Sequence, residues 1–534
     1  MNKLFEQLMK KRGITEEFLR PKYEDLADPF ALPDMEPAVE RIVQAVKNQH
    51  HILIYGDYDV DGVTASTVMA DALRLAGIKK IDIMLPDRFA DGYGMSSKIV
   101  KRVKDLKVEL VITVDCGSSN QAIIEELTTL GVDTIVTDHH EISTDLPDAV
   151  AVVNPKRNDY DGFRDLAGVG VAFKLAQALV KKGLIKEGQE KWLLDLVLIG
   201  TICDNMPLVK ENRILSFYGM KVLAKTRRAG LKELMAKAGV KTLNTDAIGF
   251  QIGPRLNAAG RLDSAELSLN LLMADKIINA AAIADKLENL NKKRKTEQQA
   301  ALDEIKKRGV SDAPVIIETG NWHEGILGIV AGKLVEEYHR PSFVLSEVQE
   351  GVFKGSGRSF GEFNLASALA ACKDYIINGG GHALAAGVKV SSDNLYGFRE
   401  KMVDYYQSLN LKDQERFLNL QEDLAVEDLA NMNLDLLDDL MLLEPFGGDN
   451  EEPVFKLQDF RVAEVRLMGA ERQHLALIVE DKNFRQIKLL AFFAPDEWRQ
   501  IAVDARLDVW VKLLENDWNG MRTIEGRILN LKYT

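Results

Sequence analysis

The chain has 534 residues, of which 46% are hydrophobic and 28% are charged. This composition is typical of a soluble globular protein, and the length predicts about three domains. No uncharged apolar run reaches the ~20 residues that a membrane span needs, and the first residues lack the apolar stretch of a secretion signal. Three cysteines are too few for a disulfide framework, so we expect a protein of the reducing cytoplasm.

The formal net charge of −13 argues against nucleic acid as a partner, because phosphate binding favours local positive charge. Two features weaken this objection. A carboxylate-lined metal site adds negative charge that its cations offset. Basic residues are also grouped, at 221–241 and at 292–295. Either group taken alone is typical of a solvated helix face.

Short apolar runs alternate with helical patterns in the first part of the chain. This alternation predicts βαβ units around a parallel sheet. The segment that follows, residues 165–284, has mostly helical patterns and completes a first domain over residues 1–284. The apolar runs of the predicted sheet are 52–55, 81–85, 110–114 and 134–136.

A charged stretch without proline comes next, and its leucines have helical spacing. We expect it to form a connecting helix over residues 285–312, although an ordinary surface helix inside one domain fits the same pattern. A second, smaller α/β domain is predicted for residues 313–408. Residues 409–534 are expected to form a small β-barrel with a helical lead-in. The predicted barrel strands are 454–457, 475–478, 487–490, 507–511 and 528–531.

Carboxylates and imidazoles follow three of the predicted strands in the first sheet. Asp57, Asp59 and Asp61 follow the first run, Asp115 follows the third, and His139 and His140 follow the fourth beside Asp138. In a parallel sheet these ends share one edge, where ligands bind in open α/β folds. Packing gives no reason to gather so much negative charge. Oxygen and nitrogen donors that converge in this way predict a divalent metal site.

Other motifs fit less well. The Asp57–Gly62 segment imitates the start of a calcium-binding EF-hand loop, but Val68 stands where that loop needs glutamate. Residues 328–334 resemble a nucleotide-binding Walker loop, yet they have one residue too few between the glycines and no Ser or Thr after the lysine. A lone aspartate after a strand is usually a helix cap. The conjunction of several such residues, and not any single one, carries the prediction.

Characteristic segments occur along the chain at 55–62 (YGDYDVDG), 85–88 (LPDR), 91–94 (DGYG), 114–117 (VDCG), 138–140 (DHH), 253–262 (GPRLNAAGRL), 355–359 (GSGRS), 379–387 (GGGHALAAG) and 443–450 (LEPFGGDN). With these segments in this order, the chain resembles the RecJ family of DHH phosphoesterases over nearly its whole length, and Asp138-His139-His140 matches the signature of these enzymes. The resemblance implies that residues 313–408 form a DHH-associated domain and that the barrel is an OB-fold that binds nucleic acid.

The resemblance implies a 5′→3′ exonuclease that hydrolyses single-stranded DNA to mononucleotides in DNA repair and recombination. It implies two divalent cations, Mn²⁺ or Mg²⁺, held by Asp57, Asp59, Asp115, His139 and Asp204. Asp115 is the candidate bridging ligand. His140 would contact the scissile phosphate or orient a neighbouring group, and we expect Asp61 and Asp138 to support the ligands. Asp115, His139 and His140 are therefore the candidate catalytic residues.

The family also implies a device that recognises the 5′ end of the strand. Guanidinium groups suit phosphate, which favours Arg88 and Arg261, while Tyr93 could stack on a base. Phe455, Phe484 and Trp518 are candidate stacking residues in the barrel, with Arg485 and Lys488 nearby. The full set of expected substrate-binding residues is Arg88, Tyr93, Arg255, Arg261, Arg358, Ser359, Gly380, Gly381 and His382.

We expect a monomer that acts without a membrane, with a single-strand DNA-binding protein and a helicase as candidate partners. Longer relatives carry a further C-terminal domain, which this sequence is expected to lack. Two alternatives remain at this point: a phosphodiesterase of the same superfamily that cleaves oligonucleotides or cyclic dinucleotides, and a non-catalytic nucleic-acid-binding scaffold of replication. The predicted barrel favours a polymeric substrate, and the full set of expected ligands favours catalysis.

Overall fold

The computed structural model describes residues 1–92, 94–142, 145–411, 420–518 and 520–534. Contacts divide the chain into two compact units. The larger unit comprises Ala27–Met206 and Tyr218–Leu418, and the barrel unit comprises Met1–Leu26, Pro207–Phe217 and Asn419–Thr534. Within the described residues, we find no helix that combines the length and the apolar character needed to cross a membrane.

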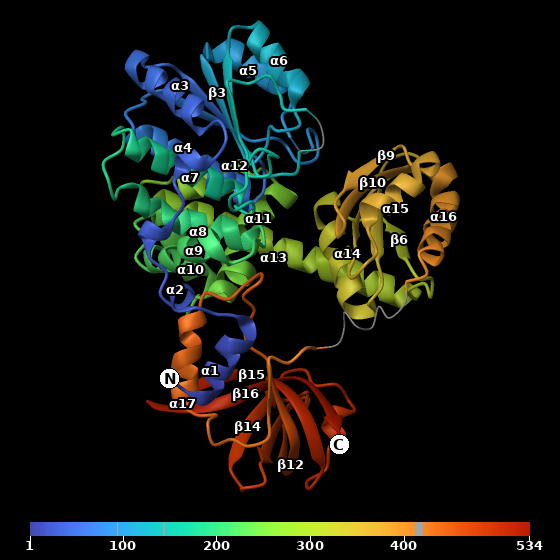
Figure 1. Ribbon diagram of the computed structural model, residues 1–534. Coiled ribbons are helices and arrows are strands. Elements are labelled where there is room, and N and C mark those ends of the chain that lie inside the picture. The colour runs from blue at the N-terminus through green and yellow to red at the C-terminus, as the bar shows by residue number, and fades with distance from the viewer. Residues whose placement is uncertain (93, 143–144, 412–419, 519) are drawn as a thin grey trace. The chain divides into compact units, whose positions relative to one another are not determined.

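The larger unit begins with a five-stranded parallel sheet in the order β2-β1-β3-β4-β5, whose middle strand β3 is labelled in Figure 1. The strands β1 and β3 are buried along their whole length, because helices cover both faces. One face packs on α5 and α6 and the other on α4. The elements are α3 Met35–Asn48, β1 Ile52–Tyr55, α4 Val60–Leu75, β2 Ile81–Met84, α5 Lys98–Leu106, β3 Leu110–Val114, α6 Gln121–Thr129, β4 Asp133–Thr137 and β5 Ala151–Val153.

Helices fill the rest of the first half of the chain, as the sequence predicted. A π-helical segment, η4 (Ala247–Ile252), leads directly into α11. The helix α8 is buried along nearly all its length and lies against α4 and α7. The helices are α7 Gly168–Lys181, α8 Leu194–Cys203, α9 Lys210–Leu223, α10 Ala229–Ala238, α11 Gly253–Leu262 and α12 Glu266–Leu272.

A long helix, α13 (Ile277–Arg308), leads into a second sheet. Its order is β6-β7-β8-β10-β9, with β6 and β7 parallel and the other pairs antiparallel. One apolar cluster joins this sheet to α13 and α14, and a second joins it to α15 and α16. The elements are β6 Ile316–Gly320, α14 Glu324–Tyr338, β7 Ser342–Gln349, β8 Val352–Arg358, α15 Leu365–Ala371, β9 Asn378–Gly381, β10 Ala385–Ser391 and α16 Leu395–Ser408.

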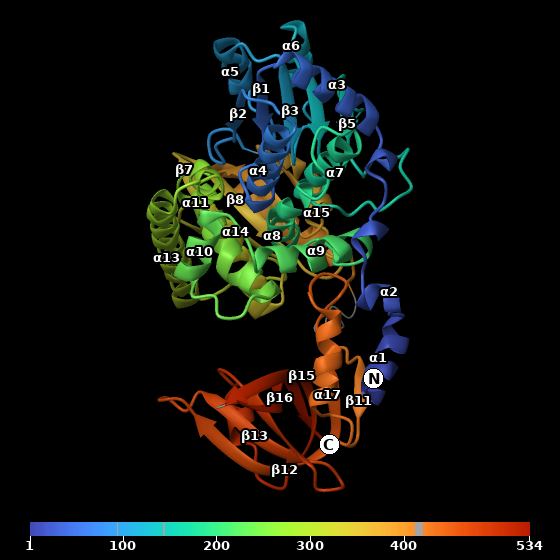
Figure 2. The same ribbon diagram turned by 90° about the vertical axis from the view of Figure 1, so that its left-hand side faces the viewer.

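Five strands form the barrel (Figure 2), and β14 and β16 are its parallel pair. The antiparallel pairing of β12 with β15 closes the barrel. Each of these strands overlaps one of the five predicted strands, and the predicted fold class is confirmed. A short strand, β11, adds to the edge of β12. The elements of this unit are α1 Lys3–Arg12, α2 Glu16–Leu19, β11 Leu424–Val426, α17 Leu434–Leu440, β12 Phe455–Met468, β13 His474–Glu480, β14 Gln486–Ala491, β15 Arg506–Trp518 and β16 Met521–Tyr533.

The N-terminal segment packs with the barrel, whereas the sequence predicted a first domain over residues 1–284. Leu4, Phe5 and Leu8 of α1 join the apolar cluster of the barrel strands. The Arg12 guanidinium forms a two-pronged ion pair with the Asp423 carboxylate, at 2.6 and 2.7 Å. The amphipathic pattern of a helix such as α1 predicts that one face is buried, but it does not predict which part of the protein covers that face. The connecting helix also differs, since α13 begins at Ile277 and not at 285.

Arg213 joins three segments of the barrel unit. Its buried guanidinium donates to the backbone oxygens of Phe18 at 3.1 Å and of Leu442 and Leu443 at 2.9 Å each, and it lies over the Phe18 ring. Arg213→Met keeps the apolar stem but removes the guanidinium donors from the Phe18 and Leu442 carbonyls, while the Leu443 carbonyl still accepts from the Asn450 amide at 2.9 Å. We expect the free energy of unfolding to fall by about 3 kcal/mol, since each unsatisfied buried group costs about 1–3 kcal/mol.

Chemical denaturation followed by tryptophan fluorescence measures this loss. The matched control is Lys210→Met, which removes an exposed positive charge from the same helix, α9. Equal stability of the two variants would show that the contacts of Arg213 contribute little.

Candidate active site

The predicted ligands come from the ends of adjacent strands. Asp57 follows β1, Asp115 follows β3, and His139 follows β4. The chain runs outward from β1 to β2 and then returns to β3 on the other side of β1. This reversal of direction is the switch point at which open α/β sheets bind their ligands. The sequence placed these side chains at one sheet edge, and the topology adds that the switch point of this edge lies between β1 and β3.

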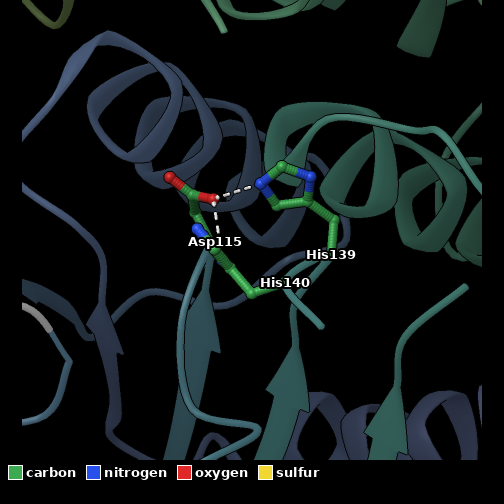
Figure 3. Close-up of side chains that lie close together, drawn as sticks. All are labelled: Asp115, His139 and His140. Atoms are coloured by element: carbon green, nitrogen blue, oxygen red, sulfur yellow. Dashed lines mark ion pairs between the residues drawn. The ribbon is translucent and has the colours of Figure 1, made fainter. Parts of the chain in front are cut away.

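Short distances join the acidic and imidazole groups (Figure 3). The His139 Nε2 atom lies 3.1 Å from Asp115 Oδ1, 3.6 Å from Asp204 Oδ2 and 3.8 Å from Asp61 Oδ2. The His140 Nδ1 atom lies 3.9 Å from Asp115 Oδ1. Possible ligand atoms fall within 4.8 Å of one another in three groups: Asp57, Asp59 and Asp115; Asp115, His139 and His140; and Asp61, His139 and Asp204.

Burial makes the negative charge at this site unfavourable. It raises the pKa of Asp57 to about 8, helped by the charge of Asp59, and it raises the pKa of Asp204 to about 8, helped by the charge of Asp61. The pKa of Asp115 lies well above its usual range for the same two reasons, burial and neighbouring carboxylates. A group of carboxylates that repel one another in a buried crevice fits a cation.

The two histidines differ in their charge. Burial lowers the pKa of His139 to about 4, so its imidazole is neutral near pH 7, which is the form that binds metals. Burial also acts to lower the pKa of His140, but the hydrogen bond to Asp138 prevails and raises it to about 9. His140 therefore carries a positive charge beside the carboxylates. The Asp138 Oδ1 atom fixes it by accepting from the His140 ring at 2.9 Å.

Two carboxylate oxygens of this site, Asp57 Oδ1 and Asp115 Oδ1, are buried and accept no hydrogen bond from any described residue. Buried polar atoms in proteins are nearly always satisfied, so these two oxygens are open to a partner that the described residues do not supply. Divalent cations such as Mn²⁺ and Mg²⁺ take carboxylate oxygens and imidazole nitrogens as ligands. The donor set, its charge and its unpaired oxygens therefore all fit the predicted metals.

Residues that the sequence did not single out hold this arrangement in place. The Asp61 carboxylate accepts from the backbone N–H groups of Gly168 at 2.7 Å and Val169 at 2.9 Å, at the start of α7. A side chain at Gly168 would meet the Asp115 carboxylate at 2.6 Å. The Asn154 amide donates to Ser118 and to the backbone oxygen of His140. The only sequence signal for Gly168 was a glycine just before a helical pattern, which has many ordinary explanations.

Three of the predicted phosphate-binding arginines lie close together. The Arg88 guanidinium stacks on the Tyr58 ring at 4.8 Å. Burial, together with the positive charges of Arg88 and Arg358, lowers the pKa of Arg261 to about 9. Among the described residues, the Arg261 guanidinium donates only to the Gly325 backbone oxygen, at 3.2 Å. Among the described residues, none of these arginines has a carboxylate within ion-pair distance, which is the arrangement of an anion site.

The remaining predicted substrate residues have varied surroundings. Arg255 is buried and forms an ion pair with Glu288 of α13 at 2.6 Å, and the Ser359 hydroxyl donates to the Phe363 backbone oxygen. Gly380 and Gly381 lie exposed in β9, at the edge of the second sheet, and an added side chain at Gly380 would meet nothing within 4 Å. The His382 side chain is exposed after the same strand. Tyr93 lies outside the described residues.

Of the barrel aromatics named from the sequence, one lies in the core and one at the surface, and the side chain of Trp518 lies outside the described residues. Phe455 is fully buried among the barrel strands, so it cannot stack on a base, whereas Phe484 is 78% exposed. The sequence prediction missed Phe492 and Phe493, which are exposed and lie edge-on to the His474 ring. The sequence did contain a signal for them: two adjacent aromatic residues closely follow a predicted strand, and adjacent side chains at a strand end cannot both point into the core.

Family models match three parts of the chain in order. Residues 51–201 match the N-terminal domain of the DHH family, residues 312–408 match the DHHA1 domain, and residues 423–530 match the RecJ OB domain. The first matched segment contains most of the proposed metal ligands, and the second contains Arg358 and the glycine-rich strand β9. The third covers the closed barrel.

Named relatives agree with these models. The chain is 35% identical to the single-stranded-DNA-specific exonuclease RecJ of Bacillus subtilis over 97% of its own length and 66% of that relative. It is 34% identical to RecJ of Escherichia coli, over 84% of this chain and 81% of that one. The crystal structure of RecJ in complex with Mn²⁺ from Thermus thermophilus matches all of this chain and 76% of that one, with a TM-score of 0.86 and 29% identity. The chain therefore belongs to the RecJ family of single-stranded-DNA-specific exonucleases.

Proposed function

We propose that this protein removes mononucleotides from the 5′ end of single-stranded DNA by metal-dependent phosphodiester hydrolysis. The observation that carries the proposal is that the larger unit holds two neighbouring sites of opposite charge. One is the buried group of carboxylates and histidines, and the other is the group of arginines without carboxylate partners. The Asp59 carboxylate is among the charges that act on Arg261, so the two sites are close. Two such sites suit the end of a DNA strand: the carboxylate site, with its cations, would take the scissile phosphodiester, and the arginines would take the terminal phosphate.

Asp57, Asp59, Asp115, His139 and Asp204 would hold two divalent cations. Asp115 belongs to two of the three groups of ligand atoms, which suits it to bridge both. When bound, such cations polarise the phosphate and lower the pKa of a water molecule toward neutrality. Asp61 and Asp138 already accept backbone hydrogen bonds, which suits them to orient their neighbours.

His140 would act on the substrate through its charge. Its side chain is only partly buried, and its protonated ring donates to Asp138. The other ring nitrogen then carries a hydrogen that can be donated to a phosphate oxygen, because both nitrogens of a charged imidazole are donors. A charged donor of this kind stabilises the negative charge that builds up on the phosphate in the transition state.

Recognition of the 5′ end is assigned to Arg88, Arg261 and Arg358. Removing Arg88 should weaken binding of a terminal phosphate without opening the core, because its guanidinium stacks on the Tyr58 ring and is not part of a buried ion pair among the described residues. We expect Arg88→Met to lower kcat/KM on 5′-phosphorylated single strands by about 10- to 100-fold, since hydrogen bonds to charged groups contribute about 1.5–3 kcal/mol.

The measurement compares kcat/KM for 5′-phosphorylated and 5′-hydroxyl strands of the same sequence. Arg102→Met is the matched control, since Arg102 is an exposed arginine on α5 that pairs with Asp82. An equal loss on both kinds of strand would contradict a role for Arg88 in recognising the end.

The polymer beyond its end would meet further surfaces. In the larger unit, the exposed β9 edge offers backbone N–H groups, and Gly380 leaves room for a close approach of the sugar-phosphate chain. In the barrel unit, Phe484, Phe492 and Phe493 offer rings on which bases can stack whatever their sequence. Arg485 and Lys488 lie nearby, although Lys488 also pairs with Glu525.

The domains proposed from the sequence, 1–284, 285–312, 313–408 and 409–534, divide these tasks, with residues 1–26 assigned to the barrel unit and the connecting helix beginning at Ile277. The first domain carries the catalytic group with Arg88 and Arg261, the second α/β domain adds Arg358, and the barrel binds the strand. We place the enzyme in the cytoplasm, as a monomer in DNA repair and recombination, because its substrate is DNA and its three cysteines are unpaired. A single-strand DNA-binding protein and a helicase, which would supply and guard the strand, are the proposed partners.

A further inference from the structure

Helix α14 carries three glycines on one face. Gly325, Gly328 and Gly332 are spaced by three and four residues, so they lie one above another on the same side of the helix. Glycine is a poor residue for a helix interior, because its backbone loses more freedom on folding than that of any other residue. Gly328 and Gly332 are also the glycines of the segment that only resembles a Walker loop. Their spacing in a helix indicates that another part of the protein approaches this face closely.

Strand β8 supplies the side chains that approach this face. Lys354, Ser356 and Arg358 alternate with glycines along the strand and therefore point to one side of the sheet. Helix α14 covers that side, because the Lys354 ammonium forms an ion pair with the carboxylate of Glu324, the first residue of the helix, at 2.8 Å. A Cβ atom added to Gly328 would lie 3.5 Å from the Cβ of Ser356 and 2.8 Å from Nη2 of Arg358. The Arg358 guanidinium therefore lies against the space that Gly328 leaves free.

The three glycines differ in what they face. A Cβ added to Gly325 would meet the backbone oxygen of Arg261 at 1.9 Å, so this glycine allows α14 to pack against the end of α11. A Cβ added to Gly332 would meet nothing closer than Cγ of Arg358, at 4.0 Å, which is an ordinary contact. Of the three, only Gly328 faces a guanidinium. The Nη1 atom of Arg358 donates to the preceding backbone oxygen of β8 at 2.8 Å, so a hydrogen bond locates one end of the guanidinium and the glycine face locates the other.

We propose that Gly328 is a positioning residue that sets the orientation in which the Arg358 guanidinium meets the DNA strand. The inference rests on the proposed function, in which Arg358 contacts the 5′ end. An added methyl group at Gly328 would displace Nη2, because non-bonded atoms prefer separations of roughly 3.5–4 Å and the available distance is 2.8 Å. The arginine side chain is long and flexible, so it would swing away at little cost to the fold. The protein would keep its charge and its structure but lose the placement of one phosphate ligand.

The test compares Gly328→Ala with Gly332→Ala, which makes the same exchange one turn later in α14. For each variant and the parent protein, kcat and KM are measured in Mn²⁺ on a 5′-phosphorylated single strand. We expect Gly328→Ala to raise KM by about tenfold, the effect of losing one charge-assisted contact. Its kcat should be nearly unchanged, because the metal ligands keep their places. Gly332→Ala should behave like the parent protein, and equal KM values for the two variants would contradict the proposal.

A double-mutant cycle shows whether Gly328 acts through Arg358. Arg358→Ala alone should raise KM, because it removes the guanidinium together with every atom of its side chain that the added methyl group would displace. Adding Gly328→Ala to Arg358→Ala should then cause no further rise, since the effects of residues that act through one contact are not additive. A second rise of similar size in the double variant would show that Gly328 acts on the fold in general, and it would overturn the proposal.

Thermal unfolding separates positioning from loss of structure. Because alanine favours a helix more than glycine does, the Tm of Gly328→Ala should equal or exceed that of the parent protein. A lower Tm together with a fall in kcat would overturn the proposal, since damage to the packing of α14 on β8 would explain it. If Gly328→Ala left KM unchanged while the parent protein hydrolysed single strands, the exonuclease function would stand and only the role of Gly328 would fall. Absence of any hydrolysis by the parent protein would instead refute the function.

Discussion

Asp115→Asn is expected to lower kcat for single-stranded DNA by about 1,000-fold or more, the scale of losing a group that stabilises transition-state charge. The exchange keeps the shape of the side chain while it removes the charge that two of the three ligand groups share. Asparagine is chosen because Asp115 has a left-handed backbone, with φ of 60°, which asparagine tolerates better than alanine. The fold should therefore persist.

Two further measurements make this prediction specific. Mn²⁺ should raise the Tm of the parent protein, because a ligand that binds only the folded state stabilises it, and this shift should shrink in Asp115→Asn. DNA binding should persist in both. Asp105→Asn, which removes an exposed carboxylate from α5, is the control and should behave like the parent protein. Loss of DNA binding together with cleavage would contradict a purely catalytic role for Asp115.

Gly168→Ala is expected to reduce kcat by at least about 100-fold, the effect of displacing a catalytic group by roughly 1 Å. The added Cβ would lie 2.6 Å from the Cβ and Oδ1 atoms of Asp115, so the carboxylate must move. The same glycine donates its N–H to Asp61, so α7 cannot simply shift away without losing that hydrogen bond. The measurement is steady-state hydrolysis in saturating Mn²⁺, with Tm recorded alongside.

Gly170→Ala is the matched control in the same turn of α7. Its added Cβ would meet Leu166 at 3.4 Å, an ordinary contact. Both exchanges favour the helix equally, by about 1 kcal/mol, so only the clash with Asp115 distinguishes them. Equal activity of the two variants would show that the position of Asp115 depends little on Gly168.

The candidate metal site could be predicted because its residues follow a local pattern. Asp57, Asp115 and His139 each stand just beyond a buried apolar run, and parallel strands bring such positions to one edge. Asp204 was different. It follows α8, far along the chain, and only the family resemblance assigned it. The structure brings its Oδ2 atom to 3.6 Å from the His139 ring.

Other features depend on contacts that no local pattern encodes. The role of Gly168 arises because α7 begins against the loop after β3. Arg255 and Arg294 read alike in the sequence as basic residues of helices, yet one has Glu288 as a partner and the other has none among the described residues. Likewise, the apolar face of α1 predicted burial but not its position against the barrel. In each case the partner lies far away in the chain, and packing of the whole fold decides the outcome.

The direction of degradation tests the account most directly. The protein is incubated in Mn²⁺ with single strands that carry a label at the 5′ end in one reaction and at the 3′ end in another. We predict that the 5′ label is released at once as a mononucleotide, without longer labelled fragments, while the 3′-labelled strand shortens progressively. Release of the 3′ label first, internal cuts, or turnover of dinucleotides but not of long strands would contradict a 5′→3′ exonuclease.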